Sequence, residues 1–199
     1  MRTVTTVILL VLTLAACSVS LPQKPPVGSV WNLRPATVPA AETQKPFGVV
    51  VAKPWLASGF DTRQVRVTLQ SGEMDALAGV AWSANYGEWL RNYFIEGLQS
   101  SGRFSSVTGN QSVRGNQVFL KLYLWDLSVH YDGPDRTSPV VEAKMVVSVT
   151  NGRGEKLVDQ QVIHSRAEVS HQRLEPIMDG FRRAVEDCFQ QVFQLLSQL

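Results

Sequence analysis

The sequence has few cysteines, few histidines and no run of basic residues, and each shortage excludes a class of protein. Its 199 residues include only two cysteines, Cys17 and Cys188, so neither a multi-disulfide framework nor a cysteine-rich zinc site can form. Because 19 Lys and Arg oppose 17 Asp and Glu, the formal net charge is only +2, and little supports binding to nucleic acid through phosphate contacts. We therefore expect no nucleic-acid partner.

The common catalytic motifs are missing as well. No G-x-S-x-G, H-E-x-x-H, C-x-x-C or G-x-x-x-x-G-K-[ST] segment occurs, which removes the usual nucleophile, zinc, redox and phosphate-binding arrangements. His130, His164 and His171 are scattered, and we interpret them as solvated polar residues. Cys188 lies on an apolar stripe, where a thiol packs as a small hydrophobic group. The sequence favours a protein that is not an enzyme and that has no metal site or bound cofactor.

The N-terminus is the first informative feature that is present, and it is typical of a lipoprotein signal peptide. Arg2 precedes an apolar run, residues 7–14, that is about half of the ~20 residues a membrane-spanning helix needs. Leu14-Ala15-Ala16-Cys17 resembles the bacterial lipobox, in which cleavage falls just before a cysteine that carries a diacylglyceryl group. We expect residues 1–16 to be removed and Cys17 to bear a covalent lipid. Ser18 after the cysteine favours the outer membrane of a Gram-negative bacterium, facing the periplasm.

Proline divides the mature chain into a tether and one domain. Six of the ten prolines fall within residues 18–46, so this stretch cannot be regular helix. We interpret residues 17–46 as a lipid-anchored, proline-rich tether in which Val30–Leu33 could form a short edge strand. Residues 47–199 have no further proline-rich break and are expected to form one α/β domain.

Hydrophobic periodicity predicts the elements of that domain. Strands are expected over 47–52, 65–69, 118–129, 145–149 and 158–169, and helices over 86–101 and from 174 onwards. Asn85 and Glu88 are spaced as in a capping box, and Gly102 is expected to end the first helix in a left-handed conformation. The fold class is therefore α+β: a two-layer sandwich in which two helices cover one face of a mostly antiparallel or mixed sheet of about 4–6 strands.

The strand expected over 118–129 has large side chains on both faces. Strict alternation places on one face Val118, Leu120, Leu122 and Leu124, and on the other Phe119, Lys121, Tyr123, Trp125, Leu127 and Val129. If both helices cover the first face, the second needs another cover. Since Tyr and Trp are enriched at interfaces, we take Phe119, Tyr123 and Trp125 as candidate interface residues. The alternative is that the N-terminal segment with Trp31 folds over this face.

The middle of the chain carries a series of motifs. Residues 53–61 follow a strand and contain aromatic residues, Leu56 and Asp61; a second strand has Arg66 at its centre; Trp82 precedes the first helix; and that helix closes on residues 101–107 with Phe104. This series resembles the ABC-type transport auxiliary lipoprotein family, the PqiC-like lipoproteins of MCE lipid-transport systems. Arg66, Trp82 and Phe104 are the positions that match.

The resemblance implies a non-enzymatic accessory lipoprotein at the outer membrane. Its expected partners are an MCE-domain protein that bridges the periplasm, the associated inner-membrane permease and outer-membrane lipid. Because conduits in such systems are rings, a cyclic homo-oligomer is the expected form of self-association. Two alternatives stay open: a lipoprotein of the lipopolysaccharide-assembly type that plugs an outer-membrane barrel, and an envelope protein that binds a small ligand.

Overall fold

The computed structural model describes residues 28–35, 43–110, 115–132, 138–151 and 156–199. The expected signal peptide and Cys17 lie outside the described residues, as does most of the expected tether. The described elements are β1 (Ser29–Trp31), β2 (Gly48–Val51), β3 (Trp55–Leu56), β4 (Gln64–Thr68), β5 (Met74–Trp82), α2 (Tyr86–Ser100), β6 (Val107–Thr108), β7 (Gln117–Asp132), β8 (Ser138–Asn151), β9 (Lys156–Glu168) and α3 (Leu174–Gln198).

The described strands form a single mixed sheet of nine strands, so the expected number of 4–6 was too low. The strands that were not expected are β5 and the short strands β3 and β6, of two residues each, whereas β1 overlaps the possible edge strand Val30–Leu33. Segments this short contain at most one period of alternation, so a sequence pattern cannot reveal them. The expected class, α+β with two helices over an open sheet, is confirmed for the described residues.

Strand β7 organises the sheet. Along one edge it pairs in antiparallel fashion with β8, which pairs in turn with β9. Along its other edge β2, β3 and β4 follow one another, each parallel to β7. β6 extends the sheet beyond β2, while β5 and then β1 extend it beyond β4. One long strand, β7, thereby aligns the three short strands β2, β3 and β4 along a single edge.

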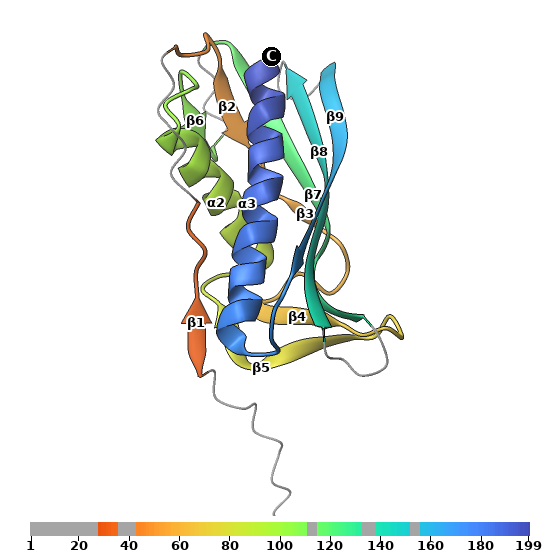
Figure 1. Ribbon diagram of the computed structural model, residues 1–199. Coiled ribbons are helices and arrows are strands. Elements are labelled where there is room, and N and C mark those ends of the chain that lie inside the picture. The colour runs from red at the N-terminus through yellow and green to blue at the C-terminus, as the bar shows by residue number, and fades with distance from the viewer. Residues whose placement is uncertain (1–27, 36–42, 111–114, 133–137, 152–155) are drawn as a thin grey trace, which may run out of the picture.

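Both helices cover the same face of the sheet, with α3 running along its length (Figure 1). Large side chains from both layers fill the space between them, and Trp82, Tyr86, Phe94, Phe181 and Phe189 have almost no exposed surface. Burying each large apolar side chain contributes roughly 1.5–3 kcal/mol, which makes this layer the main source of stability. None of the helices in the described part of the chain is both long and apolar enough to cross a membrane.

A β-bulge in β7 overturns the strict alternation expected for that strand. Leu124 pairs with Met145 and Asp126 pairs with Lys144, so Trp125 is the additional residue. One extra residue reverses the facing of every later side chain. Leu127 and Val129 therefore point into the helix-covered core, where both are fully buried. Their assignment to the same face as Tyr123 was wrong for this reason.

The two ends of α2 (Tyr86–Ser100) differ in how well the sequence predicted them. Asn85 is the N-cap, but it forms no capping hydrogen bond, and its side-chain amide donates instead to Asp61 Oδ1 at 3.2 Å. The expected capping box is therefore not formed. Gly102 follows the C-cap with a φ of +60°, the left-handed conformation expected for it.

Candidate docking surface on the open face of the sheet

The face of the sheet opposite α2 and α3, here called the open face, carries a line of aromatic and aliphatic side chains. The registers of four strands place Trp55 of β3 beside Tyr123 of β7, Tyr123 beside Val146 of β8, and Val146 beside Val162 of β9. We call these four residues the cross-strand row. Residues directly opposite each other in neighbouring strands have Cβ atoms about 4.5–5.5 Å apart, so the row forms a continuous strip.

The cross-strand row is exposed at both ends. Trp55 has 70% of its surface exposed and Val162 has 59%, although both are large apolar side chains. The rings of Trp55 and Tyr123 are nearly parallel, with centroids 6.5 Å apart and an angle of 17° between them. This stacking favours one orientation of the exposed Trp55 ring, so a partner can contact it with little further loss of side-chain freedom.

Trp125 extends the surface on one side of the row. The bulge leaves its side chain 48% exposed, and the Lys144 ammonium lies 5.4 Å from the centre of its ring. Such a cation–π contact favours one orientation of the indole and places a positive charge at the margin of the apolar strip. The surface formed by the cross-strand row and Trp125 is therefore amphipathic at this edge.

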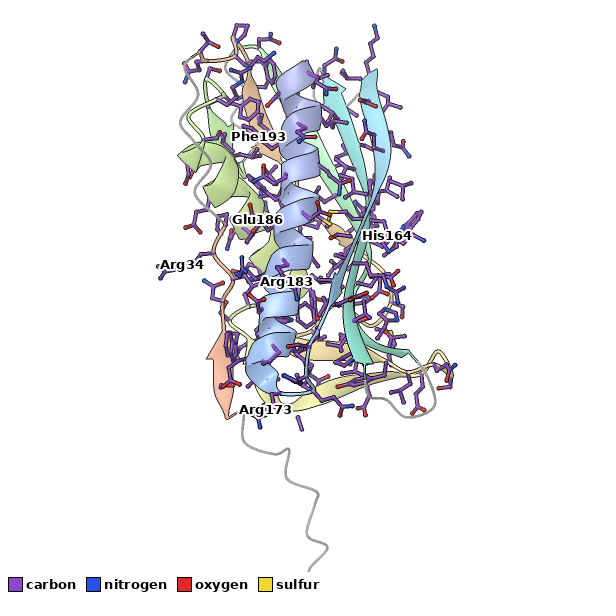
Figure 2. The ribbon with its side chains drawn as sticks, in the orientation of Figure 1. Arg34, His164, Arg173, Arg183, Glu186 and Phe193 are labelled. Atoms are coloured by element: carbon purple, nitrogen blue, oxygen red, sulfur yellow. The ribbon has the colours of Figure 1, made fainter. Side chains whose placement is uncertain are left out.

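Polar residues border the surface next to Lys144. His164 Nε2 lies 2.9 Å from Glu142 Oε1, and Arg166 Nη1 lies 3.9 Å from Glu142 Oε2. Figure 2 shows His164 on the side of β8 and β9 away from α3. An apolar centre with a polar, charged rim is the usual composition of a protein–protein interface.

A Ser, a His and an Asp also meet on the open face, but their geometry is not that of a catalytic triad. Asp126 Oδ2 lies 2.7 Å and Ser128 Oγ 3.1 Å from His130 Nε2, so both groups contact the same ring nitrogen. A triad needs the serine on one nitrogen and the carboxylate on the other. Ser128 is also fully buried, and its hydroxyl is shared with Thr68 at 2.8 Å. The cluster joins β4 to β7.

Of the three interface candidates from the sequence, the structure places two on the exposed surface. Tyr123 and Trp125 lie there, Tyr123 half-buried beneath Trp55. Phe119 lies on the open face too, but only 3% of it is exposed, so its ring is not available to a partner. Sequence reasoning missed Trp55 and Val162. Trp55 was visible as an isolated tryptophan, yet only the pairing of β3 with β7 brings it beside Tyr123.

The residues that carried the family resemblance lie in the scaffold. Trp82 is fully buried, stacked on Trp89 with centroids 5.0 Å apart. Phe104 is buried against Phe47 and Phe193. The Arg66 backbone N–H donates to Tyr86 Oη at 3.1 Å, and its guanidinium donates to Gln64 Oε1. These contacts stabilise the fold. Separately, no group of three or more His, Cys, Asp or Glu side chains that could hold a metal ion occurs among the described residues.

Solved structures with the same architecture exist, although no protein-family model and no curated protein matches the sequence. The crystal structure of protein XCC0632 from Xanthomonas campestris, of family DUF330, has a TM-score of 0.72 and 14% sequence identity. The match covers 86% of this chain and 100% of that one. The two chains share one fold.

Two further solved structures are similar. An uncharacterized protein has a TM-score of 0.65 at 12% identity, over 86% of this chain and 99% of that one. The hypothetical protein CT253 from Chlamydia trachomatis has a TM-score of 0.52 at 11% identity, over 75% of this chain and 95% of that one. At such low identity the likeness to XCC0632 and to these two structures establishes the fold, while function has to be argued from the site.

Proposed function

We propose that this protein is a PqiC-like envelope lipoprotein, a non-enzymatic accessory subunit of an MCE and ABC-type lipid-transport system. Cys17 carries the lipid and holds the domain at the outer membrane, facing the periplasm. The open face then docks on the periplasm-spanning conduit or on a second copy of the chain in a ring. The sequence resemblance around Arg66, Trp82 and Phe104 and the fold shared with XCC0632, of family DUF330, support this assignment.

The observation that carries the docking role is the cross-strand row, exposed at Trp55 and Val162, together with Trp125. Trp and Tyr are enriched among the few residues that dominate binding energy at interfaces, especially where their rings are already held in place. Trp55 is stacked on Tyr123, and Trp125 is oriented by Lys144, so both rings have lost part of their freedom before a partner binds. Membrane confinement raises the effective concentration of the chain, which makes such weak contacts sufficient for assembly.

The lipid anchor is tested with the full chain in a Gram-negative host. Mass spectrometry of the membrane-extracted protein should find an N-terminus at Cys17 with diacylglyceryl modification, and Cys17→Ala should leave the outer-membrane fraction. A Cys188→Ala variant is the matched control, because the second cysteine is buried and should not affect fractionation. An unmodified chain, or Cys17→Ala that still fractionates with the outer membrane, would contradict the anchor.

The docking role is tested with the double variant Trp55→Ala, Trp125→Ala. Both side chains are largely exposed, so the variant should fold and reach the membrane as the wild type does. It should recover at least tenfold less MCE-domain protein in a pull-down after cross-linking in cells, and it should lose any ring seen on native gels. Arg182→Ala, Arg183→Ala on the exposed side of α3 is the control and should change neither.

Two results would contradict the docking proposal. One is a folded double variant that recovers the MCE-domain protein as well as the wild type does, which would show that the interface does not include Trp55 and Trp125. The other is a wild-type chain that recovers no MCE-domain protein or permease at all, which would remove the transport role.

A further inference from the structure

A cavity of about 630 Å³ is lined by residues of β1, β4 and β5. These strands lie at the opposite margin of the sheet from β9 (Figure 1). Its described lining consists of Val30, Thr62, Arg63, Gln64, Ala76, Leu77, Ala78, Gly79, Val80, Ala81 and Asn85. Small-molecule sites are typically roughly 300–1,000 Å³ in volume, mostly apolar, with a few convergent polar groups. The cavity agrees with that description in size and composition.

The backbone of β5 builds this cavity. Gln64 of β4 pairs with Ala81, but Arg66 pairs with Ala76, so residues 77–80 arch away from the ladder. Gly79 has a φ of +72°, a conformation that favours glycine, and its carbonyl accepts a hydrogen bond from the Gly28 N–H at 3.0 Å. This bond ties the arch to the segment that leads into β1. The cavity therefore results from the backbone conformation of β5 and not from one small side chain.

Arg63 is the sole charged side chain among the described lining residues, and no Asp or Glu is among them. Its Nε donates to the Trp82 carbonyl at 3.0 Å, and its own carbonyl accepts from the Trp82 N–H at 2.7 Å. The first bond holds the guanidinium beside the cavity, and the second fixes the backbone of Arg63. No ion pair to Arg63 occurs in the described part of the chain, so its terminal N–H groups can bind an added anion.

Most of the remaining lining is apolar, and Thr62, Gln64 and Asn85 add uncharged polar groups. Val30 and Leu77 offer aliphatic side chains, Val80 is buried, and Ala76, Ala78 and Ala81 contribute only methyl groups. Binding a hydrocarbon chain against such apolar surface is favourable by about 0.8 kcal/mol of free energy for each CH₂ removed from water. An apolar wall and one anchored guanidinium together select a molecule with an apolar tail and an anionic head.

We propose that this cavity binds one anionic amphiphile, with its acyl chain against Val30 and Leu77 and its phosphate or carboxylate on Arg63. The ligand class comprises a phospholipid and a fatty acid, which share this chemistry. The inference does not rest on the docking role, because none of the lining residues belongs to the cross-strand row.

The test places a photoreactive residue in the cavity of the full-length lipoprotein in its native membrane. Intact cells that contain the Ala78→p-benzoylphenylalanine variant are irradiated before any detergent is added. The mass of the purified protein is then measured by mass spectrometry. The expected result is a covalent adduct with the mass of a phospholipid or of a fatty acid, and the mass tells the two sources apart. The same residue at the exposed position Ser71, in the turn between β4 and β5, is the control and should give no such adduct.

Two second-site variants ask whether the adduct depends on this cavity. Arg63→Gln removes the charge while its amide can still donate to the Trp82 carbonyl, and adduct yield should fall about tenfold, as for the loss of a charge-assisted hydrogen bond. Ala76→Phe fills the cavity without touching that contact and should abolish the adduct. Thermal unfolding of each variant checks that it is folded. If Arg63→Gln does not fold, Ala76→Phe alone shows whether the adduct depends on the cavity.

Three outcomes would overturn the proposal: no lipid adduct at Ala78, an equal yield at Ser71, or adducts of uncharged lipids only. A folded Arg63→Gln variant with unchanged yield would overturn the assignment of the head group to Arg63, and with it the anionic class of the ligand.

Discussion

The hydroxyl of Tyr86 links the start of α2 to two strands of the sheet. It donates to the Leu127 carbonyl of β7 and accepts from the Arg66 N–H of β4, both at 3.1 Å. Because the ring is fully buried, no water can replace either bond. We expect Tyr86→Phe to lower the free energy of unfolding by about 1–3 kcal/mol, since two backbone groups lose their partner.

Urea unfolding measures this difference, and Tyr123→Phe is its control. Tyr123 is half-buried on the open face, so removal of its hydroxyl should change stability by less than about 0.5 kcal/mol. A Tyr86→Phe variant that unfolds at the same urea concentration as Tyr123→Phe would show that the two backbone groups find other partners.

Cys188 is expected to be unreactive in the folded protein. Its thiol has no exposed surface and packs 4.0 Å from the Ala143 carbonyl of β8. Burial, with a smaller effect from Asp187, raises the pKa of the Cys188 thiol to about 12, so little reactive thiolate forms near neutral pH. A thiol reagent should modify it only as fast as the protein unfolds, and at once in guanidinium. Rapid stoichiometric modification without denaturant would contradict the burial.

At the scale of the elements, two glycines let α3 lie close to its neighbours. A Cβ on Gly180 would stand 2.8 Å from Val169 Cγ2 and 2.9 Å from Val141 Cγ2, both β-branched and buried. A Cβ on Gly97 of α2 would stand 2.6 Å from the Phe189 ring of α3. Such distances are too short for any residue with a side chain, so the packing of α3 requires glycine at both positions.

We expect Gly180→Ala to destabilise the protein by about 1–3 kcal/mol through overpacking, although alanine favours helix by about 1 kcal/mol. Gly87→Ala in the first turn of α2 is the matched control. Its added Cβ would meet Leu56 at 3.4 Å, an ordinary contact, so stability should stay equal or rise. The urea midpoints of the two variants measure the difference. A Gly180→Ala variant as stable as Gly87→Ala would mean that α3 can shift without cost.

The elements also show how far a sequence pattern reaches. The long strands and both helices have enough periods of alternation or of helical spacing to be recognised. Their bounds in the structure differ from expectation by at most three residues, except that β8 begins at Ser138, seven residues before the expected start. The bulge at Trp125 left only an indirect signal in the sequence: strict alternation would place the polar residues Asp126, Ser128 and His130 on the apolar face that precedes them. Its position is set by the pairing of β7 with β8.

For the whole molecule, buried acids predict a loss of stability at alkaline pH. Burial raises the pKa of Tyr86 to about 12, and the pKa of Cys188 to about the same value. Burial and the Glu186 carboxylate, 2.9 Å from its hydroxyl, raise the pKa of Tyr93 as well. Each group is protonated in the folded chain at a pH at which it ionises in the unfolded chain, so unfolding releases protons there.

The stability contributed by these groups is fully present below about pH 9 and is lost as the pH rises towards 12. Each pH unit above a group's ordinary pKa, about 9 for the Cys188 thiol and about 10 for the two tyrosines, costs about 1.4 kcal/mol until the raised pKa is reached. We expect the urea midpoint to fall steadily from pH 9 to pH 11, and to fall less steeply in Cys188→Ala, which has one such group fewer. A midpoint that is constant over this range would contradict the burial of these groups.

The sequence by itself determined the helix-over-sheet architecture, because that depends on a repeating pattern. It also predicts the tether and the lipid attachment at Cys17 from local composition, and both stay predictions. Tyr123 and Trp125 were recognisable as interface candidates for the same reason. The tertiary structure alone decided that Phe119 is buried, that Leu127 and Val129 turn inward, and that Trp55 and Val162 join the surface. Those outcomes follow from the strand register and from the bulge in β7, which depend on pairing between segments far apart in the chain.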